Sequence, residues 1–193
     1  VGMSYKFAIA LYRRLNQNSE EVNEHLDLVA LGTAADIVPL VNENRILTKF
    51  GIKQVARSAK PGLKSLIFVS GLLGKEIGTG QVVFIIAPRI NAVGRLGNAE
   101  LAIKLLSTKD PDQANQIARK LNEENKKRKD IDERTLYHAS QMIREIVDLE
   151  NDKAIVLAGE GWHQGVIGIV ASRLVEKYHR PTIMISIDGL PVP

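Results

Sequence analysis

A single aspartate, Asp36, interrupts an apolar stretch of the sequence. Ala34 and Ala35 precede it, and Ile37, Val38 and Pro39 follow it. A carboxylate in such surroundings is expected to be partly desolvated, and a charge removed from water needs a cation or several hydrogen-bond donors. Mg²⁺ and Mn²⁺ prefer oxygen ligands, so Asp36 is a candidate metal ligand. The alternative is that Asp36 caps a helix or a turn through its own backbone.

A second group of polar side chains surrounds Gly94. Arg89, Asn91 and Arg95 are expected to lie in one short loop that follows an apolar run ending at Pro88. Each guanidinium presents a rigid fork of donors that suits a phosphate group. The segment therefore predicts a phosphate-binding loop, and the alternative is a solvated loop without a ligand.

A third candidate is the glycine-rich segment of residues 161–168, GWHQGVIG. Gly165 would let backbone N–H groups face an anion at the start of a helix. His163 could donate a hydrogen bond to a phosphate, and Trp162 could stack on a base of a single strand. The alternative places Trp162 in the core and His163 on the surface.

A fourth candidate is the basic run from Asn125 to Lys129. Such a run is usually a solvated face of a helix. If the helix joins two domains, the run faces the gap between them, where a nucleic-acid strand could pass. Both interpretations remain open at the level of the sequence.

The elements that would position these residues are mostly helical in the first part of the chain. Apolar residues at helical spacing predict helices. The polar residues 16–25 predict a loop, and residues 26–31 form a buried segment that is either helix or strand. The predicted helices span residues 3–15, 43–57, 63–73 and 99–106.

A long helix is predicted from Asp110 to about Leu149. Asp110 is a good N-cap, Pro111 suits the first helical position, and Gln113 completes a capping box. Residues 122–130 contain no apolar side chain. A helix that is polar all round between two amphipathic ends indicates a bridge between two domains, and the alternative is a long surface helix.

The remaining residues alternate between strand and helix. A strand is predicted at 154–157, a helix at 165–178 and a last strand at 182–187. This order predicts parallel strand pairing in an α/β domain. The fold class is thus α/β, with a first domain at 1–109, a connecting helix at 110–150 and a second domain at 151–193.

The composition excludes several classes of site. The chain has no cysteine, which excludes disulfides, zinc–thiolate sites and cysteine nucleophiles and fits a cytoplasmic protein. Walker A, HExxH and G-x-S-x-G sequences are also absent. With 26 Lys and Arg against 22 Asp and Glu, the net charge of +4 permits a polyanionic partner without requiring one.

The two ends of the sequence suggest a truncated chain. Position 1 is not a methionine, and the last predicted strand is followed by only six residues. The chain also lacks an apolar run of about 18 residues, so a membrane-spanning segment is not expected. We therefore expect an internal fragment of a longer protein with no membrane association.

Three segments, taken together and in order, resemble signature segments of the RecJ exonucleases in the DHH phosphoesterase superfamily. They are residues 31–40 (LGTAADIVPL), 90–96 (INAVGRL) and 161–174 (GWHQGVIGIVASRL). The resemblance extends to about Ile187, and the third segment is the most specific. It implies the C-terminal part of a DHH domain, a long connecting helix and the start of a DHHA1 domain.

The resemblance also implies an activity, namely metal-dependent 5′-to-3′ hydrolysis of single-stranded DNA in recombination and repair. The implied cofactor is a two-metal centre of Mn²⁺ or Mg²⁺, in which Asp36 matches the last of the metal-binding aspartates. Arg89, Asn91 and Arg95 match a segment that lines the substrate path. No protein partner is implied.

Departures from the family pattern limit what this chain is expected to do alone. The family's Asp-rich and Asp-His-His motifs are absent, and residues 188–193 replace an expected glycine-rich phosphate-binding segment. We therefore expect the fragment to be inactive by itself. Two alternatives stay open: a DHH phosphodiesterase acting on short oligonucleotides or cyclic dinucleotides, and a non-catalytic nucleic-acid-binding remnant.

Overall fold

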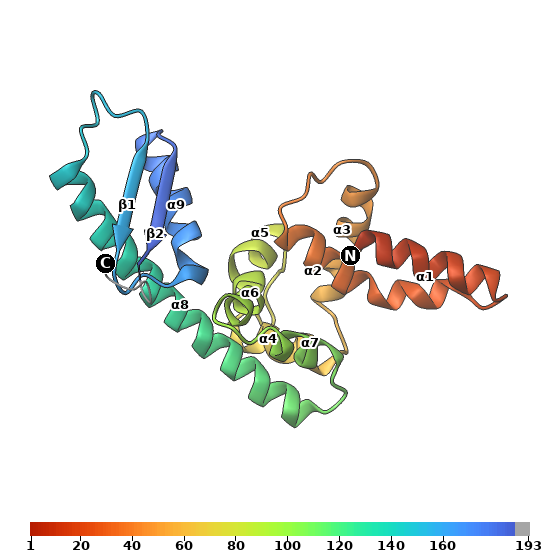
Figure 1. The fold of residues 1–193 in the computed structure, drawn as a ribbon. Helices are drawn as coiled ribbons and strands as arrows, with labels where there is room; N and C mark the ends of the chain where they lie inside the picture. Colours follow the sequence, from red (N-terminus) through yellow and green to blue (C-terminus); the bar gives the residue numbers. More distant parts are fainter. Residues whose placement is uncertain (188–193) are drawn as a thin grey trace. The chain divides into compact units, whose positions relative to one another are not determined.

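The computed structural model describes residues 1–187, which form helices and one small parallel sheet (Figure 1). The chain divides into two compact units. Unit 1 comprises residues 1–94 and 98–122, and unit 2 comprises residues 95–97 and those from 123 onward. The division falls within the long helix α8, so this helix contributes to both units and is not a separate connecting element between them.

Unit 1 is helical throughout its described residues. Its elements are α1 (Gly2–Arg14), η1 (Ser19–His25), α2 (Leu26–Ala35), α3 (Asn42–Val55), α4 (Pro61–Val69), α5 (Thr79–Gln81), η2 (Val82–Ile86), α6 (Ala87–Arg95), α7 (Glu100–Ser107) and the first part of α8 (Pro111–Ile146). The four helices predicted by apolar spacing are confirmed. The open segment at 26–31 is helix, and the loop predicted at 16–25 is wrong from Ser19 onward, where a short 3₁₀ helix forms.

The loop predicted around Gly94 is also wrong. A π-helical turn, η2, leads directly into α6, which continues to Arg95. Pro88 lies in the first turn of α6, where its missing N–H and fixed φ are tolerated. The proline therefore marks the start of a helix and not the end of ordered structure, and Arg89, Asn91 and Arg95 all lie on one helix.

The core of unit 1 combines side chains from most of its helices. Its largest fully buried members are Leu63 and Leu66 from α4, Ile86 from η2, Leu105 from α7 and Leu121 from α8. Full burial of an aliphatic side chain of this size contributes about 1.5–3 kcal/mol. These contacts hold α6, and with it Asn91, next to the C-terminal end of α2.

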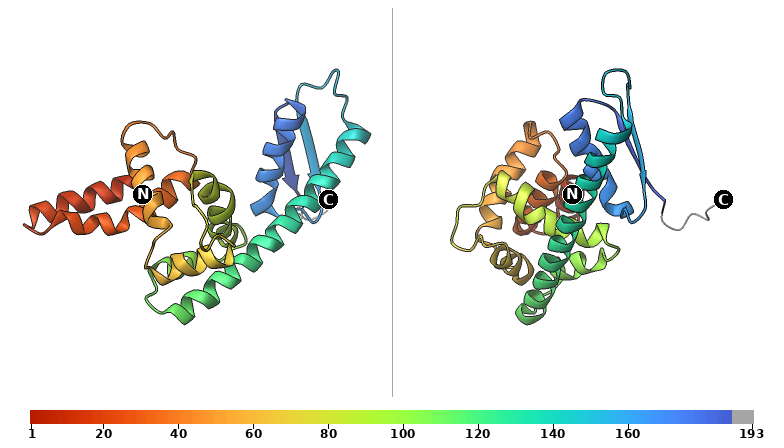
Figure 2. Two further views of the ribbon diagram at one scale, coloured as in Figure 1. Left: turned by 180° about the vertical axis from the view of Figure 1, so that it is seen from behind. Right: turned by 90° about the vertical axis from the view of Figure 1, so that its left-hand side faces the viewer.

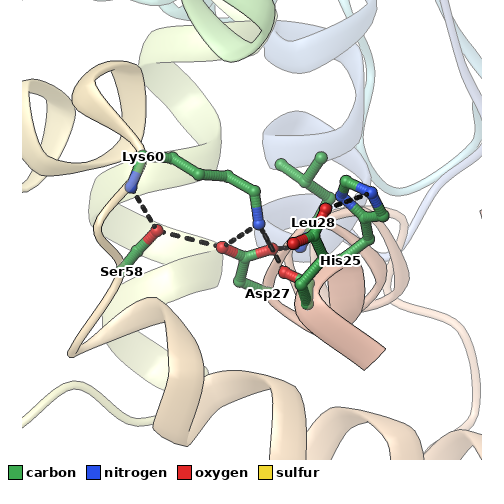
Figure 3. Close-up of polar contacts among 6 residues, drawn as sticks. His25, Asp27, Leu28, Ser58 and Lys60 are labelled. Atoms are coloured by element: carbon green, nitrogen blue, oxygen red, sulfur yellow. Dashed lines mark hydrogen bonds and ion pairs between the residues drawn. The ribbon is translucent and has the colours of Figure 1, made fainter. Parts of the chain in front are cut away.

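One buried ion pair fixes a loop of unit 1 to the start of α2 (Figure 3). Asp27 is only 2% exposed, and Lys60 Nζ lies 2.7 and 2.8 Å from its two carboxylate oxygens. The Ser58 hydroxyl donates to Asp27 at 3.0 Å, and the backbone N–H of Leu28 donates at 2.8 Å. Four hydrogen bonds thus satisfy this carboxylate, which ties residues 58–60 to α2.

Unit 2 contains the strand–helix–strand arrangement predicted from the sequence. β1 (Ile155–Gly159) pairs in parallel with β2 (Thr182–Ser186), and α9 (Gln164–Tyr178) connects them. α8 and α9 lie on the same side of the two strands (Figure 2), where they form one apolar core. Its buried members are Ala139, Ile143, Ile155, Leu157, Trp162, Val166, Val170 and Leu174.

The long helix α8 begins as predicted and ends three residues earlier, at Ile146. Asp110 caps it, because its carboxylate accepts hydrogen bonds from the N–H groups of Asp112 at 2.9 Å and Gln113 at 3.4 Å. Its polar middle, residues 122–130, is not solvated all round, since Asn125 is 2% exposed. None of the helices in residues 1–187 is both long and apolar enough to cross a membrane.

Candidate functional site

Asp36 is the C-cap residue of α2, and its own N–H donates to the carbonyl of Gly32 at 3.2 Å. The side chain is exposed, so the expected desolvation of this carboxylate is wrong. The reason is that Ile37 and Val38, which the sequence suggested would bury it, are themselves 78% and 38% exposed. Within residues 1–187 the Asp36 carboxylate makes no hydrogen bond or ion pair, which leaves it available to a ligand.

Asp36 and Asn91 line the same hollow of about 290 Å³ in unit 1. The rest of its wall is apolar and comes from Val1 and from α2, α6 and α7: Val1, Leu28, Leu31, Gly32, Ala35, Ala87, Ile90 and Leu106. The fold thus brings together two oxygen-bearing side chains that are 55 positions apart in the sequence. A carboxylate and an amide oxygen are both suitable ligands for a hard divalent cation.

These two groups do not make a complete metal centre. Among residues 1–187, no three His, Cys, Asp or Glu side chains lie close enough together to hold a metal ion. A divalent cation bound at low coordination by one carboxylate would keep most of its water and dissociate readily. Asp36 therefore fits the role of a single ligand, and this part of the chain does not supply the others.

Arg89 does not share the hollow with Asn91. Its Nε donates to Asn122 Oδ1 at 2.9 Å, and its Nη1 donates to the carbonyl of Ile85. Partial burial lowers the pKa of Arg89. Two of its donors are therefore used within unit 1, which ties α6 to α8 and leaves fewer donors for a phosphate.

Arg95, at the end of α6, belongs to unit 2. Its Nη1 donates to the carbonyl of Gly165 at 3.4 Å. Gly165 in turn lies so close to this segment that an added Cβ would be 2.2 Å from the Arg95 carbonyl oxygen. The partners of Arg89 lie in unit 1 and that of Arg95 lies in unit 2. Phosphate binding by Arg89, Asn91 and Arg95 stays a prediction.

The start of α9 is capped from within. His163 is the N-cap residue, and its Nδ1 accepts a hydrogen bond from the N–H of Gly165 at 3.0 Å. The N–H groups of Val166 and Ile167 donate to the His163 carbonyl at 2.8 and 3.1 Å. The N–H groups of Gly165, Val166 and Ile167 thus have acceptors within the chain, and anion binding at this helix start stays a prediction.

Trp162 lies in the core of unit 2 and is 3% exposed. Its indole Nε1–H donates to Nδ1 of His138 at 3.1 Å, and the two rings meet edge to face with centroids 5.7 Å apart. A ring in this position is not accessible for stacking on a base. The structure therefore favours the alternative in which Trp162 is a core residue.

Replacing His138 with alanine is expected to lower the stability of unit 2 by about 1 kcal/mol, because the Trp162 indole N–H loses its acceptor. Trp162 is the only tryptophan in the chain, so its fluorescence reports on unit 2 alone. The measurement is urea unfolding followed by this fluorescence. His25→Ala, an exposed histidine of unit 1, should leave the midpoint unchanged, and an equal midpoint for both variants would contradict the pairing.

Sequence reasoning missed a charged cluster in unit 2. The carboxylate of Asp132, 1% exposed, forms ion pairs with Arg173 Nη1 at 3.3 Å and with Arg128 Nη1 at 3.7 Å, and its Oδ1 accepts no hydrogen bond among the described residues. Arg128 Nη2 also donates to Asn125 at 3.4 Å. From the sequence, residues 125–129 were expected to be either a solvated run or a run that faces a nucleic-acid strand. The missed signal was the spacing of four residues between Arg128 and Asp132, which puts both on one face of a helix.

The electrostatics of this cluster are unbalanced. The pKa of Arg128 is lowered mainly by burial, the Asp132 carboxylate acts in the opposite direction, and the positive charges of Arg95 and Arg173 lower it further. Arg128 thus feels the positive charges of Arg95 and Arg173, and Arg128 and Arg173 share the buried Asp132 carboxylate.

The sequence and the fold of this chain are similar to those of one group of known proteins. No family model matches the chain. The chain is 39% identical over 188 residues to the single-stranded-DNA-specific exonuclease RecJ of Bacillus subtilis, which covers 97% of the chain and 23% of that protein. It is 37% identical over 187 residues to RecJ of Thermus thermophilus, with 96% of the chain and 26% of that protein covered.

Solved structures agree with these relatives. The crystal structure of Thermus thermophilus RecJ with Mg²⁺ matches with a TM-score of 0.81 at 37% identity, over 92% of this chain and 27% of that one. A structure of exonuclease RecJ bound to manganese matches with a TM-score of 0.79 at 40% identity, over 92% of this chain and 43% of that one. The chain spans about a quarter of the length of the curated relatives named above. The resemblance to the RecJ exonucleases is therefore confirmed, and the chain is a relative of one segment of these proteins over nearly its whole length.

Proposed function

We propose that the intact protein of which this chain is a segment is a metal-dependent exonuclease specific for single-stranded DNA. The observation that carries the proposal is similarity over 97% of the chain to proteins that bear this name. Relatives of known structure were solved with Mg²⁺ or with manganese, which supports a divalent metal cofactor. On the basis of the family resemblance, the proposal also includes digestion of the strand from 5′ to 3′ and a role in recombination and repair.

The domain assignment is part of the same proposal. Residues 1–109 would be the C-terminal part of a DHH domain, 110–150 a connecting helix and 151–193 the start of a DHHA1 domain. Support comes from the long helix α8 and the parallel strand pair that follows it. Asp36 would contribute one ligand to the metal centre. Residues of the intact protein that lie outside this chain would contribute the other ligands.

The residues of this chain would contribute to the metal centre through Asp36 and Asn91. When bound, two divalent metals supply an activated water and stabilise the leaving oxygen of the phosphodiester. Asp36 would hold one metal through a carboxylate that has no competing partner in residues 1–187. Asn91, across the same hollow, offers an amide oxygen or an N–H donor to a ligand beside that carboxylate.

The test is Asp36→Asn in the intact protein. We expect loss of Mn²⁺-dependent degradation of a long single strand by at least about a hundred-fold, because even groups that only support metal ligands commonly cost 10–100-fold. Asn keeps the shape of the side chain and removes its charge. Asp110→Asn, which changes an exposed cap residue in unit 1, should leave the activity unchanged.

Three results would contradict parts of this proposal. Full activity of the Asp36→Asn variant would remove Asp36 from the metal centre. Hydrolysis of dinucleotides with no activity on long single strands would favour a phosphodiesterase for short oligonucleotides. Metal-dependent nuclease activity of the purified 193-residue chain would refute our expectation that this segment is inactive alone.

A further inference from the structure

A hollow of about 540 Å³ lies in unit 1 between α4 and α8. Its apolar wall consists of Ala59, Pro61, Phe68, Leu73 and Pro111. Among residues 1–187, none that lines this hollow also lines the hollow of Asp36. Small-molecule sites in proteins commonly measure roughly 300–1,000 Å³ and combine apolar walls with a few fixed polar groups. The hollow therefore has the volume that a ligand such as a nucleotide needs.

Rigid elements hold this hollow in shape. Pro61 and Pro111 occupy the starts of α4 and α8, where the fixed φ of proline suits the first turn of a helix. The hydroxyl of Ser65, on α4 and 6% exposed, donates to Asn115 Oδ1, on α8, at 2.8 Å. This hydrogen bond joins the two helices at the hollow. A ligand would therefore bind to a preformed site, which lowers the entropic cost of binding.

The polar groups of the hollow are available to a ligand. Lys64, on α4, and Arg119, on α8, form no side-chain hydrogen bond or ion pair within residues 1–187. The amide N–H groups of Asn115 also have no acceptor in this part of the chain. No Asp or Glu is among the described residues that line the hollow. The hollow therefore presents two uncompensated positive charges beside an amide donor.

Phe68 adds an aromatic surface to these charges. Its side chain is 57% exposed although it lies on the apolar wall, and Leu73, on the same wall, is 59% exposed. An accessible aromatic ring is a platform on which a nucleobase stacks. An amide such as that of Asn115 donates to acceptor atoms on the edge of a base, and ammonium and guanidinium groups bind phosphate. The side chains of this hollow thus match the parts of one nucleotide.

We propose that this hollow binds a free nucleoside monophosphate, with the base against Phe68 and the phosphate paired with Lys64 and Arg119. The charges decide between a free nucleotide and one unit of a strand. A phosphomonoester carries about −1.5 to −2 at pH 7, which the two cations compensate, whereas each phosphodiester of a strand carries a single negative charge. The proposal is independent of the proposed function, because it involves neither Asp36 nor a metal.

The test is isothermal titration calorimetry of the full 193-residue chain with deoxyadenosine monophosphate, in the presence of EDTA to exclude metal-dependent binding. Lys64→Gln and Arg119→Gln are each expected to weaken binding about ten-fold, as for the loss of one charge-assisted contact. Phe68→Leu keeps an apolar side chain and removes the stacking surface, so it should also weaken binding about ten-fold.

Matched controls separate this site from the rest of unit 1. Lys49→Gln and Phe50→Leu make the same changes at exposed positions of α3 that do not line the hollow, and we expect both variants to bind like the parent chain. Asp36→Asn should also leave the affinity unchanged. Circular dichroism establishes that each variant is folded. Loss of binding in Asp36→Asn, with full binding in Lys64→Gln, would place the nucleotide in the hollow of Asp36 and overturn the proposal.

Two analogues test the role of the phosphate. Deoxyadenosine, which lacks the phosphate, should bind at least about a hundred-fold more weakly, because both charge-assisted contacts are lost. The monomethyl ester of the nucleotide carries a single negative charge and should bind about ten-fold more weakly, because one of these contacts is weakened. Equal affinity for all three compounds would show that the two cations do not hold the phosphate.

Competition identifies any other occupant of the hollow. An oligonucleotide of twelve deoxyadenosines without a terminal phosphate is expected to displace the nucleotide only at concentrations far above the dissociation constant of the nucleotide. Displacement by this strand below that constant would make a strand the ligand. Displacement by an acidic peptide of alternating glutamate and leucine below the same constant would make the hollow a docking site for a protein segment. No binding of the mononucleotide at millimolar concentrations would refute the site.

Discussion

Replacing Asp27 with alanine is expected to lower the free energy of unfolding of unit 1 by roughly 3 kcal/mol. Removal of one partner from a buried ion pair commonly costs about 3–5 kcal/mol, because the other charge is left uncompensated. We expect the lower end because the Lys60 side chain is 27% exposed and keeps partial access to water. The hydroxyl of Ser58 and the N–H of Leu28 lose their acceptor at the same time (Figure 3).

Hydrogen exchange of the backbone amides of α2, α3 and α4 is the suitable measurement, because it reports on unit 1 without unfolding unit 2. The matched control is Lys6→Ala, which removes an ion pair of the same 2.7 Å length between exposed side chains of Lys6 and Glu43. An exposed pair of this kind contributes about 0–1 kcal/mol. Equal effects of Asp27→Ala and Lys6→Ala would show that the burial of Asp27 is unimportant.

The second large effect is expected for Gly165→Ala. The added Cβ would lie 2.2 Å from the carbonyl oxygen and 3.0 Å from the carbonyl carbon of Arg95. Both are backbone atoms, so one of the two segments has to move. Overpacking of this kind commonly costs about 1–3 kcal/mol, and we expect the free energy of unfolding of unit 2 to fall by about 2 kcal/mol.

Gly168→Ala is the control for this variant. Gly168 lies on the same helix α9, and a Cβ at this position would meet nothing within 4 Å. An alanine there should stabilise the helix by up to about 1 kcal/mol, because glycine is a poor helix former. Urea unfolding followed by Trp162 fluorescence measures both variants. Stabilisation by both alanines would show that Arg95 does not lie against α9.

The helices and strands that could be predicted from the sequence are those that depend on residues close together in the chain. Apolar residues at helical spacing predicted α3 and α7, and Asp110 with Pro111 predicted the start of α8. The order of strand, helix and strand predicted the parallel pair β1 and β2. Such signals are readable because capping and amphipathic spacing involve residues that are neighbours in the chain.

The loop predicted after Pro88 was wrong because tertiary packing, and not the local sequence pattern, determines the structure there. Pro88 was taken as a break, yet the π-helical turn before it passes directly into α6. The turn packs into the core through Ile86, and α6 packs into it through Val93. A proline lacks the backbone N–H that would donate a hydrogen bond. This property alone does not determine whether a helix ends before the proline or begins at it. The position of Arg89, Asn91 and Arg95 on a helix followed from that packing.

By itself, the sequence determined the membership of the chain in a RecJ-like group, its helical first part and its parallel strand pair. The tertiary structure alone decided which side chains are accessible. It exposed Asp36, buried Trp162 and brought Arg173 to Asp132 across 41 positions of sequence. Burial and charge pairing depend on side chains supplied by distant segments, so the spacing of residues along one helix cannot reveal them.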